Sequence, residues 1–321
     1  RRQRKRNLVM VVDTILFGDC RETLKEFDGK ARTCVTSPPY YGLRDYGGEE
    51  SQIGQEQTPE EYIQNLVEVF RSVRDVLTDD GTLWVNIGDS YYNYRPGKGQ
   101  ALPKQTVSKT KQDLPDKCAK RGNKLEGLKE KDLIGIPWML AFALRADGWY
   151  LRQDIIWHKP NPMPESVKDR CTKSHEYIFL LSKNRKYYYN NEAIKEPVKQ
   201  DWGTRDRTKG KYHNPGTGLV PHSGLSKSYD RKNKRDVWTV TNKPYKGAHF
   251  AVYPPDLIEP CIKAGSEEGD IVLDPFMGSG TTALVSKSLN RHYIGCELHE
   301  DYGRLIQKRL SEKSFARLKL E

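Results

Sequence analysis

The chain has 321 residues, 36% of them hydrophobic, which fits one or two globular domains with an adequate core. No apolar run reaches the roughly 18 residues that a membrane-spanning helix needs, and no signal peptide is visible. Six cysteines are scattered without a Cys-x-x-Cys pair, which argues against a zinc site and favours a reducing compartment with unpaired thiols. We therefore expect no bound metal.

The net charge of +11 is unevenly distributed along the chain. Residues 151–250 hold 21 lysines and arginines against 10 aspartates and glutamates, so this third carries the whole excess. Such segregation favours a surface that binds a polyanion such as nucleic acid, although a solvated basic face would have the same composition. The basic arm at 1–8, which opens with RRQRKR, would be a DNA contact, a nuclear address or a solubilising tail.

Over residues 9–159, short apolar strands alternate with helices in an α/β pattern. An amphipathic helix is predicted at 58–77, with Thr58 as its N-cap and Pro59 in its first turn. The other predicted elements are strands at 11–19, 32–37, 81–89, 149–159 and 177–183 and a helix at 136–148. The polar, basic stretch at about 95–131 interrupts this alternation and is expected to be a long mobile loop that orders on a polyanion.

The remaining chain divides into a polar segment at 160–245 and an ordered segment at 246–321. The first is rich in Lys, Arg, Asn, Gly, Pro, Ser and Tyr and predicts a separate loop-rich module or a large insertion. The second begins with a predicted helix at 254–265 and continues as strand, Gly-rich turn, helix, strand and helix. This βαβ unit predicts a doubly wound, mostly parallel sheet with a ligand crevice at the carboxyl ends of its strands.

The Gly-rich turn LDPFMGSGTT (Leu273–Thr282) follows a buried strand and opens a helix. Gly278 and Gly280 permit positive φ and let the backbone approach a ligand closely. No lysine follows these glycines, so a Walker phosphate loop is not expected. Glu297 closes the next strand about 20 residues further on, where a carboxylate can accept both hydroxyls of a ribose.

The stretch TSPPYYG (Thr36–Gly42) follows a second buried strand. Pro38 and Pro39 cannot extend a β-ladder, so the backbone is stiff and its carbonyls can accept hydrogen bonds from a ligand that carries N–H groups. Tyr40 adds a flat face on which a ring can stack. The alternative is a strand-ending turn with one surface tyrosine.

Together, SPPY and DPFMGSGTT resemble the motifs of the S-adenosylmethionine-dependent DNA amino-methyltransferases. The catalytic motif comes first and the cofactor glycines last, as in the circularly permuted β-type group. Blocks such as ILFGDC, LWVNIGDSYY, WHKPNPMPESVKDRCTKSHE and HFAVYPPDLI extend the resemblance over nearly the whole chain. It implies a seven-stranded, Rossmann-like class I methyltransferase sheet, in which a target-recognition region at 160–245 is inserted between a catalytic half at 9–159 and a cofactor-binding half at 246–321.

The resemblance also implies roles for single residues. Ser37 and the Pro38 carbonyl would accept the hydrogens of an exocyclic amine, while Tyr40 stacks on a base swung out of double-stranded DNA. Asp274 would hold the amino end of the methionine moiety, Glu297 the ribose, and Asp19 would approach the adenine. The catalytic set is Ser37, Pro38, Pro39 and Tyr40, and the cofactor-binding set is Asp19, Phe250, Pro254, Asp274, Phe276, Gly278, Gly280, Thr281 and Glu297. Asn86 and Asp89 are expected to stabilise the floor of the site.

Serine before PPY resembles the N4-cytosine members, whereas DPPY is more usual for N6-adenine. We therefore expect methyl transfer to cytosine N4 in DNA, with adenine N6 as the alternative. Ring-carbon methylation needs a cysteine nucleophile, and Cys261 lies within a predicted helix as a packed core residue. A catalytically inactive DNA reader and an RNA substrate are the other hypotheses. A homodimer stays open, and the expected location is the prokaryotic cytoplasm at the nucleoid or, in a eukaryote, the nucleus.

Overall fold

The computed structural model describes residues 12–42, 52–92, 125–198, 205–206, 225–226, 230–242 and 253–311. The chain divides into two compact units, of which one is Asn190–Arg235 and the other is Arg1–Tyr189 together with Asp236–Glu321. In the parts that are described, no helix is long and apolar enough to cross a membrane. The arm at 1–8 and residues 95–124 of the expected loop lie outside the described residues.

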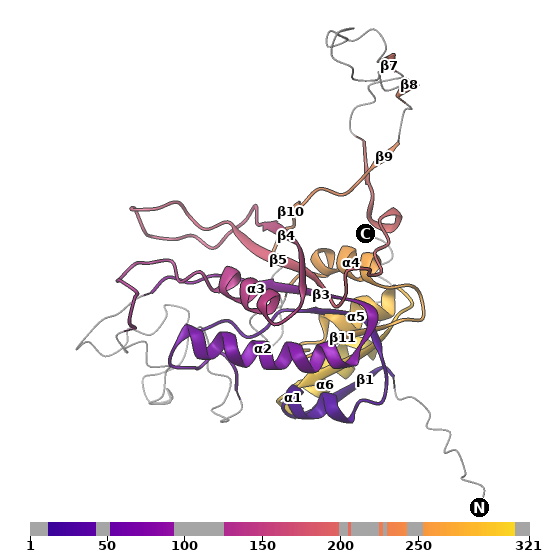
Figure 1. Ribbon diagram of the computed structural model, residues 1–321, viewed down its shortest axis with the longest axis horizontal. Helices are drawn as coiled ribbons and strands as arrows, with labels where there is room; N and C mark the ends of the chain where they lie inside the picture. Colours follow the sequence, from indigo (N-terminus) through magenta and orange to yellow (C-terminus); the bar gives the residue numbers. More distant parts are fainter. Residues whose placement is uncertain are drawn as a thin grey trace, which may run out of the picture. The chain divides into compact units, whose positions relative to one another are not determined.

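The larger unit is built on a sheet in the order β1-β12-β11-β2-β3-β5-β4-β10 (Figure 1). The strands are β1 (Thr14–Phe17), β2 (Ala31–Thr36), β3 (Leu77–Ile87), β4 (Tyr150–His158), β5 (His175–Ser182), β10 (Val237–Thr239), β11 (Ile271–Asp274) and β12 (His292–Glu297). Only β5 runs antiparallel to its neighbours, so the expectation of a mostly parallel α/β sheet is confirmed. The expected count of seven strands is wrong, because the described residues include an eighth, β10, which pairs in parallel with β4.

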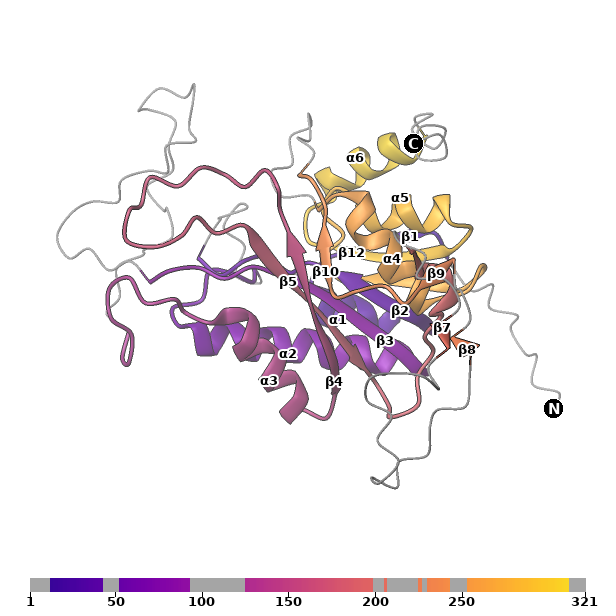
Figure 2. The ribbon, with the colours of Figure 1, turned by 90° about the horizontal axis from the view of Figure 1, so that it is seen from above.

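Helices lie on both faces of this sheet. They are α1 (Cys20–Thr23), α2 (Pro59–Val76), α3 (Ile136–Ala146), α4 (Pro255–Gly265), α5 (Thr281–Ser288) and α6 (Glu300–Ser311), with a short 3-10 helix, η1 (Leu24–Glu26). Figure 2 shows α2 and α3 on one side of the strands and α4, α5 and α6 on the other. Helix α1 lies on the side of α2, because its Cys20 belongs to the same buried cluster as the α2 side chains. The predicted start of α2 is confirmed, since Thr58 forms a capping box with Glu61.

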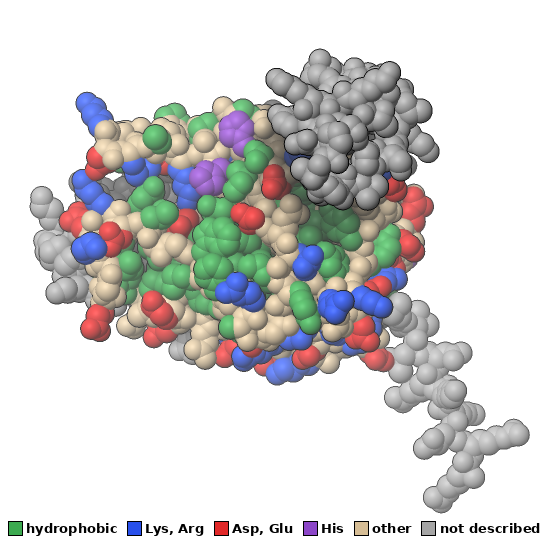
Figure 3. Space-filling view, turned by 45° about the horizontal axis from the view of Figure 1, so that its top comes forward, with side chains coloured by type: hydrophobic (Ala, Val, Ile, Leu, Met, Phe, Trp, Pro, Cys, Tyr) green, Lys and Arg blue, Asp and Glu red, His purple; other side chains and the backbone are tan. Residues whose placement is uncertain are grey.

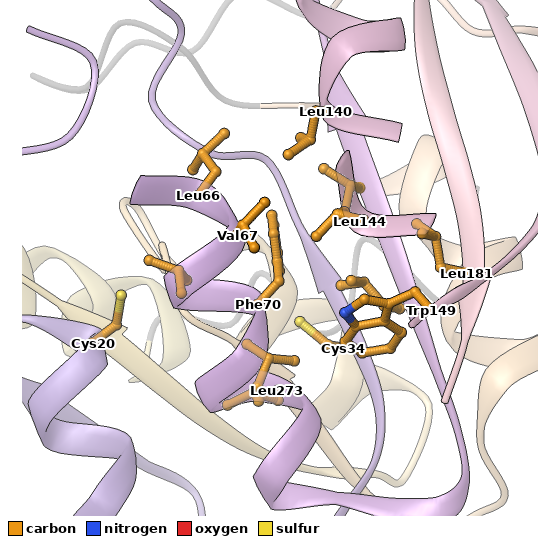
Figure 4. Packing of buried hydrophobic residues seen from close by; sticks show 14 of the residues in the cluster. Cys20, Cys34, Leu66, Val67, Phe70, Leu140, Leu144, Trp149, Leu181 and Leu273 are labelled. Atoms are coloured by element: carbon orange, nitrogen blue, oxygen red, sulfur yellow. The ribbon is translucent and has the colours of Figure 1, made fainter. Parts of the chain in front are cut away.

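The core lies between α2 and the central strands. The side chains of Tyr62, Leu66 and Phe70 on α2 are completely buried. Figure 4 shows Phe70 beside Cys34 of β2 and Leu273 of β11. Each fully buried apolar side chain of this size contributes about 1.5–3 kcal/mol. The two strands that lead into SPPY and into the Gly-rich turn are therefore fixed in the hydrophobic core of the unit.

The smaller unit contains short pieces of secondary structure. These are η2 (Glu192–Ile194), the pair β6 (Glu196–Pro197) with β9 (Arg231–Lys232), and the pair β7 (Arg205–Asp206) with β8 (Leu225–Ser226). The unit is narrower than the 160–245 segment expected from composition, because β5 and β10 belong to the large sheet.

The surface of the described residues mixes charges of both signs. On the face in Figure 3, lysines and arginines lie among acidic side chains, and hydrophobic side chains gather between them. In the smaller unit, Lys232 and Arg235 both pair with Glu196. A basic residue in the 151–250 segment is therefore not by itself a phosphate contact.

The cysteines behave as expected where they are described. Five of them are free, four of these buried, and Cys118 lies outside the described residues. Cys261 is 1% exposed within α4, and its thiol contacts the Leu257 carbonyl one turn earlier. This packing is that of a core cysteine.

Candidate active site

The two sequence motifs meet at one edge of the sheet. Strand β11 lies between β12 and β2 and is parallel to both, so the carboxyl ends of the three strands share an edge. Helix α5 follows β11 on one face, whereas α2 connects β2 to β3 on the other. The strand order therefore reverses between β11 and β2, and ligands of open α/β sheets bind at such a switch point.

Asp274, at the end of β11, connects the motifs directly. Its carboxylate is 1% exposed and accepts four hydrogen bonds from the chain itself. The Thr36 hydroxyl donates to Oδ1 at 2.6 Å and the Phe276 amide at 3.0 Å, while Oδ2 accepts from Tyr253 at 3.0 Å and from Thr282 at 2.6 Å. Burial raises the pKa of Asp274, and these bonds lower it only in part. Thr36 immediately precedes Ser37, so this carboxylate ties the start of SPPY to the Gly-rich turn.

Glu297, at the end of β12, faces the same turn. Its Oε2 accepts from the Gly278 amide at 2.8 Å and its Oε1 from the His299 amide at 3.1 Å. Burial raises the pKa of Glu297 to about 7, because backbone amides compensate only part of the lost hydration. A carboxylate held by two backbone donors keeps lone pairs with which it can accept further hydrogen bonds.

The Gly-rich turn is fixed from α6. Arg309 donates to the Ser279 carbonyl at 2.6 Å and to the Thr281 hydroxyl at 3.3 Å. Gly280 has φ of +80°, and a Cβ there would lie 2.8 Å from the side chain of Ile306. Glycine at this position is thus required by the packing of α6, whereas Gly278, with φ of +53°, is required by the turn itself.

The other predicted cofactor residues occupy different kinds of position. Asp19 is the N-cap of α1 and binds the Arg21 guanidinium through both carboxylate oxygens. The pKa of Asp19 is lowered overall, because burial, which acts to raise it, is outweighed by the bonds from Arg21. Pro254 is buried at the start of α4, and Phe276 is half-buried against the core. Phe250 lies outside the described residues.

The backbone of the SPPY segment is braced by α2 and by Gly54. Tyr62 of α2 donates its hydroxyl to the Pro39 carbonyl at 2.7 Å. Gly54 has φ of +103°, and a Cβ there would lie 3.2 Å from the Tyr40 carbonyl oxygen. The stiffness expected from the two prolines is thus increased by packing from outside the motif.

The Tyr40 side chain enters a polar cluster. Its hydroxyl donates to Oε2 of Glu176 at 2.7 Å, and Nδ2 of Asn86 donates to the same oxygen at 3.2 Å. Lys159 forms an ion pair with the other oxygen of Glu176. Burial, followed by the charge of Glu176, raises the pKa of Tyr40 well above its ordinary value, so the phenol keeps its proton.

Asp89, expected in the floor of the site, caps α3. Its Oδ1 accepts from the amides of Gly135 at 3.0 Å and Ile136 at 3.1 Å, at the start of the helix. Lys173 donates to the Asp89 carbonyl at 2.8 Å. Asn86 and Asp89 therefore both hold surrounding structure in place, and their position in the floor of the site stays a prediction.

Three contributors were missed by the motif-based prediction: Tyr62, Glu176 and Tyr253. Tyr253 and Glu176 lie inside the blocks HFAVYPPDLI and WHKPNPMPESVKDRCTKSHE, which was the only signal in the sequence. Tyr62 looks like an ordinary buried position of an amphipathic helix. Their partners are 21 to 136 residues away, so the contacts follow only from the fold.

Comparison with known proteins decides the family. The model of the N6/N4 methyltransferase family, described as DNA methylase, matches residues 31–308. The chain belongs to this family of DNA methylases. It is 47% identical to the type II methyltransferase M.SmaI of Serratia marcescens, over 92% of this chain and 90% of that protein. It is 46% identical to M.XycI of Xanthomonas campestris pv. cyanopsidis, over 94% and 89% of the two chains.

Solved structures show the same fold. The PvuII DNA methyltransferase (cytosine-N4-specific) superposes with a TM-score of 0.60 at 17% identity and covers 97% of this chain and 91% of its own. TTHA0409, a putative DNA modification methylase from Thermus thermophilus complexed with S-adenosyl-L-methionine, has a TM-score of 0.57 at 22% identity over 95% and 94%. The methyltransferase sheet predicted from the motifs is therefore confirmed as a fold.

The protein is accordingly a DNA methyltransferase with S-adenosylmethionine as cofactor. The residues at the switch point fit this group. Asp274 and Glu297 are both buried carboxylates with raised pKa, and in the described parts of the chain neither forms a hydrogen bond or ion pair with a lysine or arginine. A cofactor with a sulfonium and an ammonium group would bring positive charge close to these two carboxylates.

Proposed function

We propose that the protein transfers the methyl group of S-adenosylmethionine to N4 of cytosine in double-stranded DNA. In this proposal it is a member of the SPPY subgroup with the circularly permuted β-type motif order. The observation that carries it is the bond from Thr36 to Asp274, which joins the SPPY segment to the cofactor turn at 2.6 Å. The cytosine-N4 specificity of the PvuII methyltransferase and the serine at position 37 support the choice of base.

The cofactor supplies an electrophilic methyl group, and the chain binds and orients both reactants. Glu297 accepts hydrogen bonds from the ribose hydroxyls. The backbone of the Gly-rich turn at Gly278 lies against the cofactor. Asp274 acts on the methionine end through water, because its own lone pairs are taken by four internal donors. Asp19 borders the adenine, and Phe250, Pro254 and Phe276 form apolar walls. Gly280 and Thr281 shape the turn.

The catalytic segment acts on the amine. The cytosine amine is a weak nucleophile because its lone pair is delocalised into the ring. Ser37 and the Pro38 carbonyl accept its two hydrogens, so the nitrogen becomes more tetrahedral as it attacks. The bound cofactor would supply the methyl group for the new N–C bond and keep the electron pair of the broken C–S bond on its sulfur, and the proton lost by the nitrogen would pass to solvent. Fixed acceptors of this kind need little reorganisation during the transfer.

The substrate would be a base flipped from the duplex and stacked on Tyr40. The segment at 160–245 provides target recognition, and the relatives support a role as the modification enzyme of a type II restriction–modification system. The bacterial relatives also favour a cytoplasmic, nucleoid-associated protein over a nuclear one. A homodimer is the assembly to be tested by sedimentation.

Nucleoside mass spectrometry of DNA methylated by the purified protein tests the proposal. N4-methylcytosine is expected as the product. N6-methyladenine as the main product would overturn the choice of base and leave the amino-methyltransferase assignment intact. An absence of tritium transfer from labelled cofactor to DNA, in protein that binds both, would support the inactive reader instead, and transfer to RNA alone would change the substrate.

A further inference from the structure

A largely buried ion pair lies beside the Tyr40 side chain of the SPPY segment. Glu176 at the start of β5 and Lys159 just after β4 have side chains that are 14% and 16% exposed, respectively. Lys159 also lies 4.2 Å above the centre of the Trp157 ring. A buried ion pair seldom adds net stability relative to apolar residues of the same volume. Its presence beside a reactive segment therefore calls for another explanation.

The Glu176 carboxylate determines the direction of the hydrogen bonds around it. An ionised carboxylate only accepts, so the Tyr40 hydroxyl must donate its proton to Oε2 of Glu176 at 2.7 Å. The other acceptor within reach of Tyr40, Oδ1 of Asn86, is 3.4 Å away and is the weaker partner. The Tyr40 oxygen is then left as an acceptor.

The ring of Tyr40 is fixed by the same arrangement. A Cβ at Gly88 would lie 2.8 Å from Cε2 of Tyr40, so the ring edge packs against the backbone there. Glu176 is itself restrained by Asn86, which also donates to the Tyr177 carbonyl at 3.1 Å. The hydroxyl and the ring edge are thus both held, and the plane of the ring is defined.

We propose that Glu176, held by Lys159 and Asn86, is a positioning residue for methyl transfer. By accepting the hydrogen bond of the Tyr40 hydroxyl, it orients the ring on which the target base stacks. This inference rests on the proposed catalytic role of Tyr40. It assigns a function to a carboxylate that lies outside both motifs.

The test compares Glu176→Gln with Tyr40→Phe under saturating DNA and cofactor. In Glu176→Gln, Lys159 binds the amide oxygen and the amide NH₂ faces Tyr40, so the Tyr40 hydroxyl loses its acceptor. The expected loss in kcat is about 10- to 100-fold, with the cofactor Kd unchanged and the KM for DNA little changed. Tyr40→Phe removes the hydroxyl and should also lower kcat about tenfold or more. The double variant should be no slower than the slower single variant, because both changes remove the same hydrogen bond between Tyr40 and Glu176.

Glu259→Gln is the matched control. Glu259 lies on α4, outside the segment assigned to target recognition, and pairs with Lys263; its side chain is 41% exposed. This variant should keep the wild-type kcat. Wild-type kcat in Glu176→Gln, or losses that multiply in the double variant, would overturn the inference. If Glu176→Gln does not fold, full turnover by Tyr40→Phe overturns it equally.

Ser37→Ala separates this inference from the proposed function. Normal turnover by Ser37→Ala would mean that the proposed catalytic segment itself is wrong. Loss of turnover in Ser37→Ala together with normal turnover in Glu176→Gln would refute only the role of Glu176.

Discussion

Lowering the pH from about 8 to about 6 should weaken binding of S-adenosylmethionine by about tenfold, because Glu297 loses its charge in this range. Burial raises the pKa of its carboxyl to about 7. The group is then about 90% ionised at the higher pH and about 10% ionised at the lower one. Only the carboxylate accepts hydrogen bonds from both ribose hydroxyls while it keeps its bonds from the Gly278 and His299 amides.

The same pKa predicts how the cofactor-free protein responds to pH. Glu297 titrates near its ordinary value of 4.5 in the unfolded chain and near 7 in the folded one. Between these values the folded state binds more protons, so its stability falls as the pH rises. A difference of this size corresponds to about 3 kcal/mol. The loss is complete above the folded pKa, where the buried group must be charged.

Isothermal titration calorimetry of wild type and Glu297→Gln measures the effect on binding. Glutamine does not titrate, so the variant should bind weakly at both pH values, apart from any pH dependence that belongs to the cofactor itself. In buffers of different ionisation enthalpy, binding to wild type at about pH 6 should release close to one proton more than binding to the variant. Identical pH dependence in the two proteins would refute the role assigned to Glu297.

Three further predictions concern single side chains, two in the site and one in the smaller unit. Asp274→Asn replaces two acceptor atoms by one and leaves buried donors unmatched, so chemical denaturation should show a loss of about 1–3 kcal/mol; unchanged stability would contradict the contacts at this carboxylate. Tyr62→Phe removes the hydrogen bond to the Pro39 carbonyl and should lower the free energy of unfolding by about 0.5–1.5 kcal/mol in the same assay. An unchanged free energy of unfolding would contradict this contribution. Charge reversal at Lys234 should weaken binding to all DNA sequences alike and reduce the slope of log K against log[salt] by about one. An unchanged slope would mean that this side chain makes no phosphate contact.

The sheet and its motifs could be predicted because their signals are local. Strands β2 and β11 are short apolar runs that end at Pro or Gly signals, and α2 begins at a recognisable N-cap. Strand β10 was missed because Val237–Thr239 is only three residues long and lies in a polar segment. It forms a strand because it pairs in parallel with β4, and this pairing cannot be predicted from the local sequence.

The contacts that orient the site were not predictable, because they join distant parts of the chain. Glu176 is 136 residues from Tyr40, and a single glutamate in a charged block looks like a surface residue in the sequence. Asp274 was assigned to the cofactor from its motif, but the fold surrounds it with donors from β2, α5 and the residue two before α4. The motif identified the right residue, and only the packing shows how its lone pairs are used.

The position of β11 explains how motifs at opposite ends of the chain form one site. Thr36 and Asp274 are 238 residues apart, yet they are bonded because β11 is inserted between β12 and β2. Each motif follows a parallel strand, so its location depends on which strands are neighbours and not on their order along the chain. The bond also couples the two halves energetically, since a shift of the Gly-rich turn displaces the acceptor of Thr36, the residue before Ser37. Cofactor binding at the turn should therefore restrict the SPPY segment, and backbone amides at 36–40 should exchange hydrogen more slowly in the cofactor complex than in the free protein, a difference that Asp274→Asn should abolish.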